Sequence, residues 1–252
     1  MKKVIYKHRY ALLLWLGVAL WCLAQLAFLT DFPFVHSDEA WLGGLSRNML
    51  EQGDMGVTET FFDAKPRYPH AIKSLFHLLQ IGFIRAFGYG IFTLRLLSLA
   101  GGAVCLVLFF RGARQITEGE GLALLLTVIF AADIQFVYAS HFARQEIWLC
   151  LALCACLVIL LKGENSVRNT VLLAAITGLA IGLHPNSFLL GCMCGSCLLL
   201  RWLIYRGSPR PLLVYIAVTA CFAAVLVAVS YSFDPHFIRD YLAYGQGEFE
   251  LL

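Results

Sequence analysis

Residues 34–41, Phe-Val-His-Ser-Asp-Glu-Ala-Trp, carry two adjacent carboxylates, Asp38 and Glu39, soon after a long apolar run ends at Leu29. A run of that kind ends at a membrane surface. Carboxylates there are costly unless they face water, a cation or a substrate. The stretch therefore predicts a membrane scaffold organised around an acidic pair.

Composition agrees with a membrane protein. Of the 252 residues, 60% are hydrophobic and 14% are charged, against about 25% charged in soluble domains. The mean hydropathy is +0.76, which is typical of a chain with several membrane spans. The net charge of +3 is small, so nothing in it indicates a nucleic-acid partner.

Nine cysteines all lie inside apolar runs. Cys192, Cys194 and Cys197 have a spacing that resembles a metal cluster, but a metal site needs polar groups around its ligands and an entry path. We interpret all nine as small apolar packing residues and expect no disulfide framework. They are Cys22, Cys105, Cys150, Cys154, Cys156, Cys192, Cys194, Cys197 and Cys221.

The first span is predicted over residues 10–29, after Lys2, Lys3, Lys7 and Arg9. A signal-peptide core has roughly 7–15 residues, fewer than this run, so we predict an uncleaved span whose N-terminus is cytoplasmic. Later runs predict six more spans, giving an all-α membrane protein with about seven transmembrane helices in one module over residues 1–252. The later spans lie near residues 92–110, 121–140, 146–161, 169–184, 187–205 and 211–230.

The first outer loop, residues 31–90, contains two expected helices. Residues 38–52 are predicted to form a short helix with Ser37 as its N-cap and Gly53 as its stop. Residues 71–87 are apolar except for a polar stripe at helical spacing. They predict an amphipathic helix lying at the membrane interface rather than a span. The stripe consists of Lys73, His77 and Gln80.

Loop charges predict the orientation. The positive-inside rule places basic loops in the cytoplasm, and the acidic loop, residues 141–146, residues 184–187 and the tail then share the outer face. We expect a multi-pass protein of the plasma (inner) membrane, with its N-terminus inside and the acidic loop outside. From residue 90 onward, the inner loops carry Arg111, Arg114, Lys162, Arg168, Arg201, Arg206 and Arg210, whereas the outer ones carry Arg144 and Arg239, with Arg95 at an edge.

Each polar group on the outer face has a structural and a chemical interpretation. Asp38 is either a solvated, helix-capping acid or a general base that takes a proton from an acceptor hydroxyl. Glu39 is grouped with it as a catalytic candidate, although it points elsewhere on the helix and could instead orient loops. Lys65 and Arg67 either anchor the interface or hold the phosphate of a lipid-linked substrate.

Two outer turns carry further candidates. Arg144 and Glu146 form either a polar hairpin or the far side of a site that includes Asp38. His184 either belongs to a helix break at Pro185 or contacts phosphate. Asp133 lies within a span, and intramembrane carboxylates are functional candidates. Carboxylates and histidines both occur in the outer loop, so a divalent metal is an option. None of their spacings is diagnostic of a metal site.

Taken together, the ordered segments HSDEAWLGGLSRNMLEQGDMG, FFDAKPRYPHAIKSLFHLLQIGFIRAFG, FTLRLLSLAGG and YASHFARQEIW resemble the membrane-embedded GT-C glycosyltransferases. The most similar branch contains the dolichyl-phosphate-mannose protein mannosyltransferases and the aminoarabinose transferases. The resemblance covers roughly residues 10–190 and implies inverting transfer of a sugar from a polyprenyl-phosphate carrier. The acceptor, on the outer face, would be a lipid, a glycan or a protein.

The resemblance also implies residue roles. Asp38 would be the catalytic base and Glu146 a second acidic residue. Lys65 would contact the carrier phosphate, and His184 lies where relatives often place a basic residue near it. Arg95 would be structural.

The chain departs from the family in two ways. Ala64 stands where aminoarabinose transferases usually have an acid, and the chain is shorter than most members, so a C-terminal module is apparently absent. The alternatives are a non-catalytic GT-C-like scaffold or fragment, and a transporter of lipid or sugar. A transporter would have charges throughout its spans and helices broken at mid-membrane.

Overall fold

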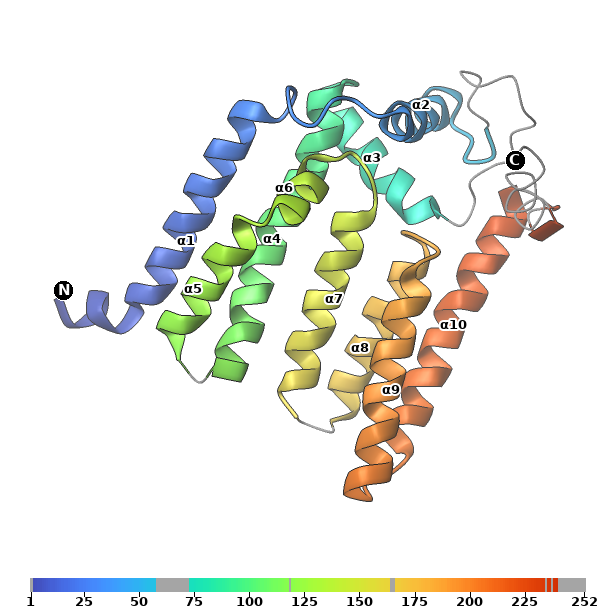
Figure 1. The fold of residues 1–252 in the computed structure, drawn as a ribbon. Helices are drawn as coiled ribbons and strands as arrows, with labels where there is room; N and C mark the ends of the chain where they lie inside the picture. The colour runs from blue at the N-terminus through green and yellow to red at the C-terminus, as the bar shows by residue number, and fades with distance from the viewer. Residues whose placement is uncertain are drawn as a thin grey trace, which may run out of the picture.

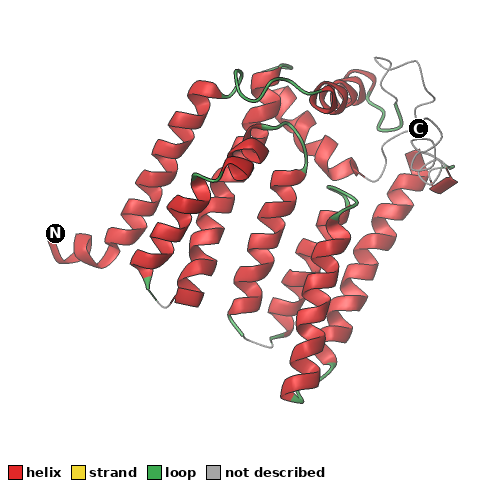
Figure 2. Cartoon of the chain, in the orientation of Figure 1, coloured by secondary structure: helices red, strands yellow, loops and turns green. Residues whose placement is uncertain are grey.

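The computed structural model describes residues 2–57, 73–117, 119–163, 166–233, 235–236 and 238–239, with side chains from residue 9 onward. Within these residues there are ten helices and no strand, as the sequence predicts (Figure 1, Figure 2). The helices are α1 (Lys2–Phe28), α2 (Ser37–Gln52), α3 (Ser74–Phe87), α4 (Ile91–Thr117), α5 (Glu120–Ala131), α6 (Ile134–His141), α7 (Glu146–Leu161), α8 (Val167–Ile181), α9 (Ser187–Tyr205) and α10 (Arg210–Phe233).

Several long apolar helices indicate a multi-pass membrane protein. By length and composition, α1, α4, α9 and α10 can each cross a membrane, and α5 with α6 forms one further pair bent by 64°. This gives four or five candidate spans among the described residues, fewer than the seven predicted. Helices α7 and α8 are apolar but have only 16 and 15 residues, shorter than the ~20 that a span needs.

The span predicted near residues 121–140 is a bent pair of helices, α5 and α6, rather than one continuous helix. The chain breaks between Ala131 and Ile134, where Asp133 has an extended backbone and caps α6 by accepting a hydrogen bond from the Phe136 N–H at 2.9 Å. Short polar side chains are preferred at a helix N-cap. This contact explains the carboxylate at the break without assigning it chemistry.

The connections between helices lie at two ends of the bundle (Figure 1). The segment between α1 and α2, the α6–α7 turn and the α8–α9 turn lie at one end, together with α2; we call this the site face. The α4–α5, α7–α8 and α9–α10 connections lie at the other end, the opposite face. The basic residues assigned above to inner loops are on helix ends and turns of the opposite face.

Two apolar clusters fill the bundle. One lies between α1, α4, α5, α6 and α7 and includes Leu106 and Ile147. The other lies between α7, α8, α9 and α10 and includes Leu173 and Leu190. Helix α7 contributes to both clusters. Large apolar side chains also face outward on α1, α5, α9 and α10, as expected for helices that contact lipid.

Helix α8 packs closely against α10 because it carries glycine at the contact. A Cβ atom added to Gly178 would lie 2.5 Å from the Cβ of Phe222, and one added to Gly182 would lie 3.1 Å from Leu226 of α10 and 2.7 Å from Leu75 of α3. Small residues at this spacing let helices approach one another closely. The other pair predicted to do so is looser, because a Cβ at Gly195 would lie 3.7 Å from Tyr215.

The short helix predicted over residues 38–52 is confirmed as α2, with one correction at its start. The N-cap is His36 rather than Ser37: its ring accepts a hydrogen bond from the Asp38 N–H at 3.2 Å. The Glu39 carboxylate returns to the His36 N–H at 3.1 Å, which completes a capping box. Gly53 ends the helix in the left-handed conformation, at φ 68°.

Helix α3 forms as predicted, but its polar stripe faces inward. The Ser46 hydroxyl of α2 lies 2.9 Å from Nδ1 of His77 and donates to Oε1 of Gln80 at 2.6 Å. Both stripe residues are fully buried, whereas Leu78 and Leu79 on the same helix are exposed. The expected interfacial helix therefore buries its polar side against α2 and turns apolar side chains outward.

Candidate functional site

A buried ion pair supports the site face. Glu39 and Arg95 are both fully inaccessible to solvent; the guanidinium Nε donates to Oε1 at 2.9 Å and a terminal nitrogen donates to Oε2 at 2.8 Å. Two-pronged pairing fits the planar geometry of both groups. Since Glu39 is on α2 and Arg95 is on α4, this contact fixes the start of α2 on the bundle.

The same two helices also hold the neighbouring loop ends. Arg95 donates to the Leu29 carbonyl at 3.0 Å, and Glu39 accepts from the Ala143 N–H at 2.9 Å. Ser98, one turn from Arg95 on α4, donates to the Phe142 carbonyl at 2.6 Å. The end of α1, the start of α2 and the α6–α7 turn are thus tied to one stretch of α4.

An acid–cation–acid cluster lies above this support. Arg144, in the α6–α7 turn, donates from one terminal nitrogen to Asp38 Oδ2 at 2.9 Å and from the other to Glu146 Oε1 at 2.7 Å. The side chains of Asp38 and Glu146 are 36% and 44% exposed, so the cluster is open to solvent. The second oxygen of Asp38, Oδ1, is 3.8 Å from Nδ1 of the His36 ring, which is longer than a hydrogen bond.

Lys73 is a second cation at this cluster. It precedes α3, and the adjoining backbone is held by a hydrogen bond of 3.1 Å from the Leu75 N–H to the Gly182 carbonyl. Its ammonium lies 5.4 Å from the centre of the Trp41 ring, a cation–π distance. Burial and the positive charge of Arg144 lower the pKa of Lys73, with Glu146 and Asp38 opposing that shift. A bound anion would stabilise the protonated form of a lysine held in this way.

His184 approaches the cluster from the α8–α9 turn. Its Nδ1 accepts a hydrogen bond of 3.0 Å from the Asn186 N–H, which fixes the ring in the turn. Burial, and then the charge of Lys73, lowers the pKa of His184. The imidazole is therefore neutral near pH 7 and offers a hydrogen bond rather than a charge.

Several buried polar atoms beside the cluster lack a partner. Arg144 Nε, Glu146 Oε2, Gln145 Nε2 and Trp148 Nε1 have no hydrogen bond within the part of the chain that the structure describes. Buried polar atoms are usually satisfied, and an unsatisfied one costs about 1–3 kcal/mol. Four such atoms around one turn are what a polar ligand or ordered water would satisfy.

The structure brings some of the predicted site residues together and separates others from them. Asp38, Arg144 and Glu146 are in contact, and His184 lies close enough to be influenced by the same charges. Glu39 corrects our grouping of the two acids as catalytic: its oxygens are buried and already bonded to Arg95. Its place is therefore beneath the site. Lys65 and Arg67 lie outside the described residues.

Two contributors were not recognised from the sequence. Lys73 had been assigned to the polar stripe of a surface helix, and Trp41 had no role. The sequence did contain an indication for Lys73, because it lies only six residues after Arg67, which was a candidate for binding phosphate. The pairing of Glu39 with Arg95, 56 positions apart, leaves no local pattern in the chain.

The carboxylates of the cluster are the groups that would hold a divalent cation. Asp38 and Glu146 each bind one end of the Arg144 guanidinium, which already supplies positive charge between them. A metal would have to displace Arg144 from both acids. Because both acids are already paired with Arg144, the arrangement does not fit a metal, and no catalytic step is assigned to a metal.

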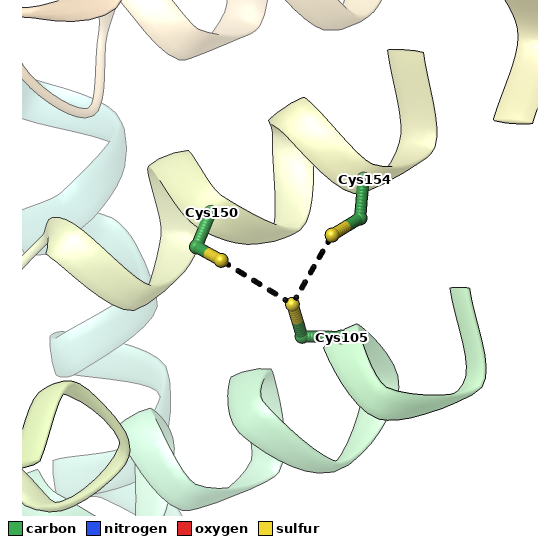
Figure 3. A group of neighbouring side chains, drawn as sticks. All are labelled: Cys105, Cys150 and Cys154. Carbon is green, nitrogen blue, oxygen red and sulfur yellow. Dashed lines mark hydrogen bonds between the residues drawn. The ribbon is translucent and has the colours of Figure 1, made fainter. Parts of the chain in front are cut away.

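Three cysteines form a separate cluster between α4 and α7 (Figure 3). Sγ of Cys105 lies 3.5 Å from Sγ of Cys150 and 3.5 Å from Sγ of Cys154, and the three sulfurs lie within 4.8 Å of one another. These contacts exceed the ~2.05 Å of a disulfide. Thiols in such a group suit a soft metal, but their neighbours are apolar, and we interpret them as packing.

Comparison of the chain with protein-family models, with curated proteins and with solved structures finds no match.

Proposed function

We propose that the chain is a membrane glycosyltransferase that moves a sugar from a polyprenyl-phosphate carrier to an acceptor, with inversion at the anomeric carbon. The observation that carries the proposal is the contact of Arg144 with both Asp38 and Glu146, with Lys73 close enough for its pKa to respond to all three charges. This arrangement offers a carboxylate for proton transfer and cations for a leaving phosphate at one end of a membrane bundle. The acceptor hydroxyl belongs to a lipid, a glycan or a protein.

The proposed reaction is a single displacement. The acceptor oxygen attacks the anomeric carbon and forms the new glycosidic bond, while the bond from that carbon to the phosphate oxygen breaks. The proton of the hydroxyl goes to Asp38 Oδ1, and the electron pair of the broken bond stays on the polyprenyl phosphate. Positive charge aimed at a developing anion is a large catalytic term, and general-base catalysis adds about 10²–10⁴-fold.

Each neighbouring residue has a distinct part in this proposal. Arg144 orients Asp38 by binding its Oδ2, so that Oδ1 faces the acceptor. Lys73 meets the phosphate, and the unsatisfied Nε of Arg144 supplies a further donor. Lys65 and Arg67 would add cations from the same loop. His184, as a neutral ring, would donate a hydrogen bond to a phosphate oxygen.

A membrane arrangement follows from the same proposal. Helices α7 and α8 complete seven crossings if they count as short spans beside the broken α5–α6 pair. The opposite face, which carries the basic turns, is then cytoplasmic by the positive-inside rule. The cluster faces the outside of a plasma (inner) membrane. Shorter helices are accommodated by local thinning of the bilayer.

Binding of the donor tests the phosphate site. The purified protein would be titrated with a series of polyprenyl-phosphate sugars, and wild type compared with Lys73→Ala, Lys65→Ala and Asp38→Asn. Binding that weakens at least about tenfold in a lysine variant, and persists in Asp38→Asn, supports a phosphate site distinct from the base. Arg85→Ala, on the exposed end of α3, is the matched control. Equal binding by all variants would contradict the assignment.

One observation favours a transporter as the second candidate. The α5–α6 pair is bent by 64° with a carboxylate at the break, and broken helices line the binding sites of many transporters. Against this, Asp133 is engaged as a helix cap. Vesicles that contain the protein separate the two candidates: a transporter moves the lipid-linked sugar across the bilayer intact, whereas a transferase releases polyprenyl phosphate.

A further inference from the structure

Two adjoining cavities open on the opposite face, far from the acidic cluster. The larger has a volume of about 420 Å³ and is lined by Gly163, Arg201, Tyr205 and Ser208, among others. The smaller, of about 230 Å³, shares Ser208 and Pro211 with the lining of the larger. The larger cavity falls within the ~300–1,000 Å³ range of ligand sites.

The charge around these cavities is positive. Arg201 lines the larger cavity and Arg210 lines the smaller, while Arg206 lies in the turn between them. In the part of the chain that the structure describes, no carboxylate lies within 4.0 Å of these three guanidinium groups. Arg201 donates to the Leu160 carbonyl through one nitrogen, which fixes the guanidinium at the cavity wall.

The turn that lines both cavities lies at the start of a helix. Helix α10 begins there, and the Arg210 N–H donates to the Ser208 hydroxyl at 3.2 Å. The start of a helix favours negative charge. Arg206 ends α9 in the left-handed conformation, at φ 47°, which is a common way for a helix to end.

The remaining walls are apolar or amphipathic. Leu198 and Trp202 line the larger cavity, Val214 lines the smaller, and Pro211 lines both. Trp202 and Tyr205 are exposed near the end of α9, where aromatic rings mark the boundary between hydrocarbon and headgroups. A ligand here would meet cations at one end and hydrocarbon at the other.

We propose that these cavities bind the headgroup of an anionic phospholipid of the leaflet on the opposite face. Its phosphate would lie between Arg201 and Arg210 beside the start of α10, and its acyl chains would run along Leu198, Trp202 and Val214. Basic pockets between helices at a membrane surface bind acidic headgroups in this way. The inference is independent of the proposed transfer reaction, because the two sites lie at opposite ends of the helices.

The test is lipid binding by the purified full chain in neutral detergent, followed by native mass spectrometry and by thermal unfolding. The probes are phosphatidylglycerol, phosphatidylcholine and glycerol 3-phosphate. Variants are Arg210→Gln and the double variant Arg201→Gln/Arg210→Gln. Arg111→Gln is the control. It removes an exposed charge from α4 near the opposite face, and Arg111 lines neither cavity. Unfolding without added lipid reports whether each variant is folded.

We expect phosphatidylglycerol to bind wild type at least about tenfold more tightly than phosphatidylcholine, a difference of about 1.4 kcal/mol. Arg210→Gln should lose part of this preference, the double variant most of it, and Arg111→Gln none. Equal binding of the two lipids, or a preference that survives in the double variant, would overturn the proposal. Stabilisation by glycerol 3-phosphate that equals that by phosphatidylglycerol would identify a soluble anion instead and overturn the lipid assignment.

Discussion

Arg95 and Glu39 meet through two hydrogen bonds, of 2.9 and 2.8 Å, with both side chains fully buried. The pair connects α4 to α2, and the same carboxylate accepts from the Ala143 N–H of the α6–α7 turn. Asp38 is adjacent to Glu39 in the first turn of α2, and Arg144 is adjacent to Ala143 in the α6–α7 turn. The buried pair therefore sets the distance between the two partly exposed residues that begin the candidate site.

Breaking this pair should destabilise the protein strongly. Arg95→Met leaves Glu39 as a buried, unpaired charge, and such losses cost about 3–5 kcal/mol. Arg114→Met removes an exposed pair with Glu120, at 3.0 Å, and should cost less than about 1 kcal/mol. Chemical denaturation in detergent measures both. Similar losses for the two variants would show that the buried pair does not stabilise the loops.

The close approach of α8 and α10 predicts different tolerance at two glycines. Gly178→Ala brings a Cβ to 2.5 Å from the Cβ of Phe222, which cannot move without its helix. Overpacking of this kind costs about 1–3 kcal/mol. At Gly195 the added Cβ has 3.7 Å to Tyr215, so Gly195→Ala should leave the unfolding temperature nearly unchanged. The idea fails if Gly178→Ala unfolds at the same temperature as Gly195→Ala.

His77 predicts a loss of stability in acid. Burial, and then the charge of Lys73, lowers the pKa of His77 from 6.5 to about 3. The unfolded chain therefore binds a proton that the folded chain does not, and stability falls as the pH falls from 6.5 towards 3. The slope of this term is roughly 1.4 kcal/mol per pH unit.

The variant His77→Gln isolates that contribution, because the carboxylates titrate in both proteins. Wild type should lose unfolding free energy through His77 as the pH falls from 7 to 4, whereas His77→Gln lacks this contribution. The difference in unfolding free energy between the two proteins should therefore shrink or change sign towards pH 4. Parallel curves for the two proteins would mean that His77 titrates as it does in the unfolded chain.

Lys73 predicts the pH dependence of donor binding. Its pKa lies below the ordinary 10.5 because of burial and of Arg144. A phosphate attracts only the protonated amine, so affinity should be constant in acid and fall about tenfold per pH unit once the pH passes the lowered pKa. In Lys73→Arg, whose guanidinium stays charged, affinity should remain flat to about pH 11. A wild-type curve that also stays flat past pH 10.5, the ordinary lysine pKa, would exclude Lys73 as the phosphate contact.

Much of the fold was predictable because apolar runs, caps and stops are local. Gly53 ends α2 as expected, and the long runs became α1, α4, α9 and α10. The break at Asp133 was missed because the apolar composition continues through it. A short acid inside a run has two local explanations, a functional group and an N-cap. Only the backbone geometry distinguishes them.

The side of α3 that faces the protein interior was the second feature that the sequence did not predict. The spacing of His77 and Gln80 shows that they share a face of α3, but periodicity cannot say whether that face meets water or another helix. Ser46 of α2 supplies the partner. The candidate site was also predicted only in part from the sequence. Asp38, Arg144 and Glu146 were predicted on one face from loop order, whereas the entry of Lys73 depends on how α3 meets α8.

The most direct test of the proposed function is the release of polyprenyl phosphate, the product common to every acceptor. Membranes that contain the protein supply native acceptors, and the donor is a labelled polyprenyl-phosphate sugar. Wild type should release the carrier, and Asp38→Asn should release it about 10²–10⁴-fold more slowly while keeping donor binding and the wild-type unfolding temperature. Release by Asp38→Asn at the wild-type rate, or none by a wild type that binds the donor, would contradict a transferase with Asp38 as its base.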